Sequence, residues 1–203
     1  MDNHIPTAHD AVKYAEDVVS GKLINNKYVK LTCQNFLDDL NTRQYEDNFR
    51  WAYDFAKADH IIQFYNACIT HTKGALAGQP YLMAPHEAFT LAQLYGWVKK
   101  EDPSERRYRN LVLQVARKNS KSTLTAGLSI YTMFMEAEGQ ECYSVATMKD
   151  QAKIVYDNTA QMIKKAPEEV KSKFKQTISA ISLPEKFSVY KALASKSDSL
   201  DGL

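Results

Sequence analysis

The stretch that decides the fold reads Asn110-Leu-Val-Leu-Gln-Val-Ala-Arg-Lys-Asn-Ser-Lys-Ser-Thr123. Its first six residues, Asn110 to Val115, form a short apolar run of the kind that becomes a buried strand. A polar loop follows, and the apolar periodicity then predicts a helix from about Ser122 to Glu136. The pair Lys121-Ser122 therefore stands where a loop meets the N-terminus of a helix.

A loop in this position can hold a phosphate group. Its backbone N–H groups can turn toward the anion, and the helix N-terminus adds a partial positive charge. In the pattern G-x-x-x-x-G-K-S/T, the lysine is the counter-charge of the β- and γ-phosphates and the hydroxyl coordinates Mg²⁺. Lys121 and Ser122 occupy those two positions. Thr123 is a secondary candidate for a phosphate contact.

The pattern is incomplete at its two glycines. Val115 and Ser120 stand in their places, where glycine is favoured because the backbone needs unusual dihedral angles close to phosphate. A simpler alternative is a basic loop followed by a helix that Ser122 caps. That alternative leaves unexplained a cluster of cations at a helix N-terminus, where positive charge is unfavourable without an anion. The cations are Arg117, Lys118 and Lys121.

Elements on both sides of this stretch predict an α/β protein. Strand, loop, helix, strand and helix in succession are typical of a parallel sheet flanked by helices. Upstream, helices are predicted over 8–19 with Thr7 as N-cap, 29–40, 55–70 and 85–97, with a connection over 72–80. Downstream, a strand is predicted over 141–146, a helix over 149–165, a short helix after Pro167, and strands near 176–183 and 187–194.

The composition excludes several classes of protein. Of 203 residues, 44% are hydrophobic and 25% charged, and the net charge of +2 gives no argument for nucleic-acid binding. No apolar run reaches the roughly 20 residues of a membrane span, and the N-terminus lacks the apolar core of a secretory signal. Neither the three cysteines nor the five histidines have metal-type spacing. A reducing cytoplasm is the expected setting.

At the loop, the sequence resembles the large terminase family of tailed bacteriophages. Members carry a deviant P-loop of the type (P/A)-R-K-N-G-K-S after a hydrophobic strand, and here it reads Ala116-Arg-Lys-Asn-Ser-Lys-Ser122. The order and spacing of further segments extend the resemblance over nearly the whole chain. These segments are Tyr14–Gly21, Tyr28–Leu40, His71–Pro80, Leu82–Trp97, Arg106–Arg109, Ala146–Lys153 and Leu200–Gly202.

The resemblance implies a P-loop NTPase-type parallel sheet flanked by helices and preceded by an N-terminal helical subdomain. The subdomain would span residues 1–75 and a partial ATPase core residues 76–203. In the family, the Walker B strand, the coupling motif and a nuclease domain follow the turn at Leu200-Asp-Gly202. We therefore expect an incomplete sheet, and residues 1–203 alone should bind ATP with negligible hydrolysis and no nuclease activity.

The same resemblance implies the activity of the full protein. It would be an ATP-driven motor and endonuclease that cuts double-stranded viral DNA and packages it into procapsids, with ATP and Mg²⁺ as cofactors. The expected partners are double-stranded DNA, the small terminase subunit, the portal protein of the procapsid and further copies of the chain in a ring. The expected location is the host bacterial cytoplasm, with no membrane association.

The family also implies roles for the loop residues. Lys121 would stabilise the transferring phosphoryl group, Ser122 would hold Mg²⁺, and either Arg117 or Lys118 would sense the γ-phosphate. The implied nucleotide-binding set is Ala116, Arg117, Lys118, Asn119, Ser120, Lys121, Ser122 and Thr123, with Lys121 and Arg117 catalytic. Members often have Trp-Gln where this chain has His86-Glu87. Glu87 is thus either an adenine contact or a first-turn acid favoured by the helix dipole.

Two other function classes stay open. A different P-loop enzyme, such as a small kinase or a helicase-like ATPase, would need its own Walker B sequence, and we find none in the chain. A non-catalytic binding or assembly module with a degenerate loop is favoured by Ser120. The roles of two further groups of residues also stay open. The arginines form either a DNA contact or a solvated basic loop, and they are Arg106, Arg107 and Arg109. The aromatic residues Phe49, Trp51, Tyr53, Phe55, Phe64 and Tyr65 are expected in the core rather than in a base-stacking platform.

Overall fold

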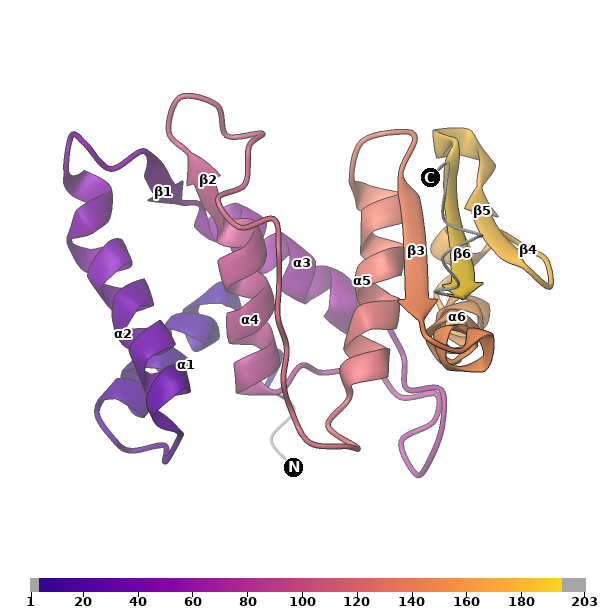
Figure 1. Cartoon of the computed structure of the whole chain (residues 1–203), viewed down its shortest axis with the longest axis horizontal. Coiled ribbons are helices and arrows are strands. Elements are labelled where there is room, and N and C mark those ends of the chain that lie inside the picture. Colours follow the sequence, from indigo (N-terminus) through magenta and orange to yellow (C-terminus); the bar gives the residue numbers. More distant parts are fainter. Residues whose placement is uncertain (1–3, 195–203) are drawn as a thin grey trace. The chain divides into compact units, whose positions relative to one another are not determined.

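The computed structural model describes residues 4–194, so the predicted turn at Leu200-Asp-Gly202 lies outside the described residues (Figure 1). The chain forms two compact units. The first contains the chain up to Asn66 together with Leu82–Val112, and the second contains Ala67–Tyr81 together with the chain from Leu113 onward. This division describes packing. The functional boundary between residues 75 and 76 stays a prediction.

The first unit is mainly helical, as the sequence predicts. Its helices are α1 (Ala8–Val19), α2 (Lys27–Asn41), most of α3 (Phe55–Cys68) and α4 (Pro85–Gly96). A short 3₁₀ helix, η1 (Arg43–Tyr45), precedes β1 (Trp51–Tyr53), which pairs antiparallel with β2 (Trp97–Lys99). The helix α1 begins as predicted, because Thr7 and Asp10 form a reciprocal capping box at its N-terminus.

Aromatic side chains form the core of the first unit. Phe36 of α2 makes edge-on contacts with Tyr53 at 5.4 Å and with Phe89 of α4 at 5.3 Å between ring centroids. Within the predicted aromatic set, Tyr53, Phe64 and Tyr65 are buried, whereas Phe55 is 37% exposed and stacks on His9. Half of the set is therefore buried in the core, where burying aromatic area stabilises the fold.

The second unit is an α/β structure with a four-stranded mixed sheet of order β3-β6-β5-β4. β3 and β6 are parallel, as predicted, whereas β6–β5 and β5–β4 are antiparallel. α5 and α6 pack on each other and against β3 and β6 (Figure 1). The elements are α5 (Lys121–Met135), β3 (Glu141–Ala146), α6 (Lys149–Lys165), α7 (Glu168–Lys171), β4 (Lys175–Gln176), β5 (Ala180–Leu183), η2 (Pro184–Lys186) and β6 (Ser188–Ala194).

One face of this sheet is buried against α6. Ile181, Leu183 and Tyr190 are buried, and the Tyr190 ring stacks on that of Tyr156 in α6 at 5.7 Å. The predicted strand over 176–183 is divided into β4 and β5 by a turn. In that turn the Thr177 hydroxyl accepts a hydrogen bond from the N–H of Ala180 at 3.0 Å, which reverses the chain.

The predicted strand over Asn110 to Val115 is wrong, because these residues have no regular structure. Leu111 is 42% exposed and Val112 is 92% exposed, so the apolar run is not buried as a strand. A strand requires a neighbour that exchanges backbone hydrogen bonds with it. Among the described strands, none pairs with residues 110–115. The apolar pattern alone therefore predicted an element that the chain does not form.

Candidate nucleotide-binding loop

The loop before α5 has a left-handed backbone at two positions. Ser120, the N-cap of α5, has φ 49° and ψ 9°, and Lys118 has φ 68°. This region of backbone space suits glycine and costs other residues about 1–2 kcal/mol each. Ser120 thus adopts the conformation for which glycine is favoured in phosphate-binding loops. A serine in this conformation is strained where a glycine would not be.

Backbone donors gather at the start of α5. The N–H groups of Lys121, Ser122 and Thr123 belong to the first helical turn, which has no carbonyl partners inside the helix. The first helical bond runs from the N–H of Leu124 to the carbonyl of Ser120 at 2.8 Å. Within residues 4–194, no group accepts a hydrogen bond from the N–H groups of 117–123. These amides can therefore donate to an anion without breaking a described bond.

Lys121 lies back across its own loop. Its Nζ donates to the carbonyl of Val115 at 2.6 Å and to that of Ala116 at 2.9 Å. The side-chain amide of Asn119 donates to the same Ala116 carbonyl at 3.3 Å. An ammonium group has three donors, so two of those of Lys121 are used within the loop. A phosphate would have to engage the third donor or exchange with these carbonyls.

The charge of the loop is uncompensated. Arg117 and Lys118 are exposed and Lys121 is half-buried, and in the described part of the chain none of them forms an ion pair. Cations near a helix N-terminus are destabilising by about 0.3–1 kcal/mol each. The hydroxyls of Ser122 and Thr123, both half-buried, have no hydrogen bond to a described residue. An anion with a bound divalent cation would satisfy both sets of groups.

Glu87 caps its own helix. Its side chain is buried with 5% exposure, and Oε2 accepts a hydrogen bond from the N–H of Ala84 at 2.9 Å. Pro85 occupies the first position of α4, which suits its missing N–H. This geometry is that of the first-turn acid. An adenine contact by Glu87 stays a prediction.

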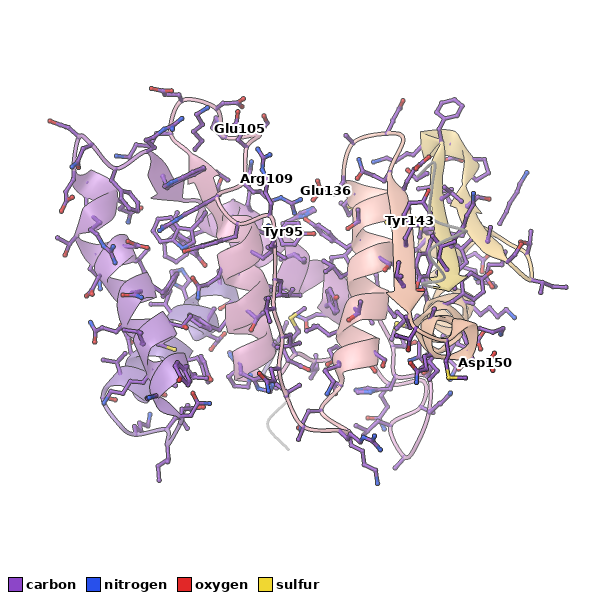
Figure 2. All side chains as sticks on the ribbon, in the orientation of Figure 1. Tyr95, Glu105, Arg109, Glu136, Tyr143 and Asp150 are labelled. Carbon is purple, nitrogen blue, oxygen red and sulfur yellow. The ribbon has the colours of Figure 1, made fainter. Side chains whose placement is uncertain are left out.

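The arginines upstream of the loop differ in their surroundings. Arg107 Nη1 donates to Asp39 Oδ2 at 2.7 Å, and Arg106 lies over the ring of Tyr95 at 4.5 Å. Figure 2 shows Tyr95 on α4 and Glu105 in the loop after β2, where Glu105 pairs with Lys99 at 3.3 Å. The contact of Asp39 with Arg107 could not be predicted from the sequence, since nothing near Asp39 indicates a distant arginine.

The remaining titratable groups show no assembled metal site. Within the described residues, no group of three or more His, Cys, Asp or Glu side chains is arranged to hold a metal ion. The cysteines are unpaired with one another, and burial raises the pKa of Cys33 and of Cys142 to about 11. No helix in this part of the chain has the length and apolar character that crossing a bilayer requires.

The second unit, with α5 and α6 packed on a mixed sheet, defines the chain as an α/β protein. The sequence family described as the terminase large subunit, ATPase domain, matches residues 85–203, which is more than half of the chain. The chain therefore belongs to the terminase large subunit family. That match begins at the first residue of α4 and includes the loop before α5.

A solved structure supports the fold independently. The chain is similar to the crystal structure of the HK97 bacteriophage large terminase, with a TM-score of 0.59 and 22% sequence identity. The similarity covers 72% of this chain and 29% of that chain, so the described fold corresponds to less than a third of that terminase. No curated protein sequence gives a match.

Proposed function

We propose that the loop over residues 116–123 binds ATP with Mg²⁺ and serves the ATPase of a phage DNA-packaging motor. Family membership supports an ATPase domain. The observation that carries the proposal is local: the N–H groups of 117–123 have no described acceptor and stand beside cations without acidic partners. A helix N-terminus with these donors has the chemistry that a triphosphate requires.

Each loop residue has a proposed role in this site. The amides of Ala116 to Thr123 surround the phosphates, while Lys121 exchanges its loop carbonyls for phosphate oxygens and stabilises the charge that develops during transfer. The hydroxyl of Ser122 ligates Mg²⁺, and the ion neutralises charge between the β- and γ-phosphates. Arg117 or Lys118 senses the γ-phosphate. Arg117 is the candidate for a second catalytic cation.

The motor itself is the wider proposal. By family, the full protein would cut and package double-stranded viral DNA in the host cytoplasm, with the small terminase subunit, the portal protein and other copies of itself as partners. By family resemblance, the carboxylates that hold Mg²⁺ and activate water would follow the turn at Leu200-Asp-Gly202. We therefore expect the 203-residue polypeptide by itself to bind ATP with negligible turnover and to have no nuclease activity.

A second candidate is a non-catalytic module with a degenerate loop. Two observations favour it: Ser120 adopts a strained left-handed conformation, and Lys121 already donates to two carbonyls. Such a module would bind nucleotides weakly, and its affinity would not depend on how many phosphate groups the nucleotide carries. The two candidates therefore differ in how affinity depends on the length of the phosphate chain and on Mg²⁺.

Competition binding separates the candidates. ATP, ADP and AMP are titrated against a fluorescent ATP analogue bound to the chain, with and without Mg²⁺. We expect ATP and ADP to compete at least about tenfold better than AMP, and Ser122→Ala to abolish the gain in affinity from Mg²⁺. Ser129→Ala, on the same helix, is the matched control. Equal competition by AMP, or an equal effect of both alanine substitutions, would contradict the proposal.

A further inference from the structure

The start of α2 presents large apolar side chains to solvent. Ile24, in the irregular segment before the helix, is 98% exposed, Tyr28 is 69% exposed and Leu31 is 58% exposed. Tyr28 and Leu31 are three residues apart and therefore lie on the same side of the helix. The opposite side packs into the core through Cys33 and Phe36. α2 thus has two apolar faces, and the first unit uses one.

The exposed face has a positive rim. Lys27 and Lys30 flank Tyr28 in the sequence, and Lys27 Nζ lies 5.0 Å from the centre of the Tyr28 ring. The sequence has no Asp or Glu from residue 18 to residue 37. Among the described acids, none pairs with Lys27 or Lys30, whereas Lys22 pairs with Asp17 at 3.1 Å. The charge that complements this face is therefore negative.

The proposed nucleotide site does not account for this face. It belongs to the first unit, and its residues precede the family match, which begins at Pro85. DNA is negatively charged, but it is bound through phosphate contacts from cationic and polar groups. Exposed isoleucine and leucine side chains add little to such contacts. Clustered apolar exposure with a polar rim is typical of a surface that another protein covers.

We propose that the α2 surface, defined as Ile24, Tyr28, Leu31, Lys27 and Lys30, docks an amphipathic helix of a partner protein whose apolar stripe is flanked by acidic residues. Tyr28 and Leu31 follow the helical spacing i, i+3, which a helical partner can match with its own stripe, and Ile24 lies three residues before the helix begins. Tyr28 is the central anchor, because tyrosine buries a large area at low entropic cost. Lys27 and Lys30 select the acidic flanks and speed association.

A designed peptide tests this surface directly. The probe is a fluorescent helical peptide of about 18 residues with a leucine stripe and glutamate flanks, titrated against the whole chain by anisotropy. A second peptide carries lysine in place of glutamate. We expect the acidic peptide to bind at least about tenfold more tightly than the basic one. The double variant Tyr28→Ser with Leu31→Ser should weaken the acidic peptide by a similar factor.

A control variant and a folding check show whether the loss of binding is specific to the α2 surface. Tyr45→Ser changes a tyrosine that is 76% exposed but lies outside the α2 surface, and it should leave affinity unchanged. Circular dichroism checks that each variant keeps its helices. No binding of the acidic peptide, equal binding of both peptides, or an equal effect of Tyr45→Ser would overturn the proposal. So would displacement of the peptide by a DNA duplex, or self-association of the chain that the double variant abolishes.

Discussion

Asp39 and Arg107 form a part-buried ion pair between residues 68 positions apart, with Nη1 of the arginine 2.7 Å from Oδ2 of the aspartate. Asp39 is 3% exposed, and Arg43 Nε lies 2.8 Å from its other oxygen. The Arg107 guanidinium also lies over the ring of Phe49 at 5.0 Å and that of Trp97 at 5.3 Å. Arg107 is therefore engaged within the first unit, and a DNA contact by this arginine stays a prediction.

We expect Asp39→Asn to destabilise the first unit by about 2–3 kcal/mol, since removing one charge of a buried pair leaves the other uncompensated. Partial exposure of Arg107 and Arg43 keeps the effect below that of a fully buried pair. Urea unfolding measures the change. Asp38→Asn, at the exposed neighbouring position, is the matched control, and an equal shift in both variants would remove the special role of Asp39.

Gly96 allows α4 to end against the aromatic core. A Cβ at this position would lie 2.5 Å from Cε2 of Tyr53 and 3.0 Å from Cβ of Ala58. Because Tyr53 is buried, its ring has little space into which to move. We expect Gly96→Ala to lower the free energy of unfolding by about 1–3 kcal/mol. Thermal unfolding of the variant measures this change. If Gly96→Ala is as stable as wild type, the core accommodates the added methyl group.

Asp10 links the stability of α1 to acid pH. Partial burial raises its pKa, but hydrogen bonds from Thr7 and His4 outweigh that effect and hold the pKa below the usual 3.8. A carboxyl with a lowered folded pKa stabilises the protein above its unfolded value, and the contribution disappears as the pH falls through the folded value. Asp10→Asn should therefore be less stable than wild type near neutral pH. The two unfolding curves should converge at acid pH, and a constant difference across the whole range would contradict this.

Substitutions of Ser120 test whether its left-handed backbone conformation is strained. Ser120→Gly should stabilise the chain by about 1 kcal/mol, because glycine adopts φ near 49° without strain. Ser120→Ala keeps a Cβ and should give no such gain. Unfolding measurements on the pair report the strain directly. A glycine variant no more stable than the alanine variant would mean that the left-handed conformation costs nothing here.

Capping residues and apolar periodicity correctly predicted the helices and strands whose formation depends on residues close together in the sequence. The start of α1 follows from the Thr7 capping box, and β3 and α6 begin and end where their patterns indicate. The left-handed backbone at Ser120 was foreseeable from the glycine that usually stands there. The features that the sequence did not predict correctly depend on residues that are far apart in the sequence. Residues 110–115 have the apolar pattern of a strand but no described neighbour, and Asp39 meets Arg107 only after folding.

The most direct test of the central claim is calorimetric titration of ATP with Mg²⁺ into wild type and Lys121→Ala. Lys153→Ala, which removes an exposed lysine paired with Asp157, controls for the loss of one positive charge. We expect saturable binding by wild type and Lys153→Ala, and affinity at least about tenfold weaker for Lys121→Ala. Equal weak binding by all three proteins would contradict the assignment of this loop as a triphosphate site.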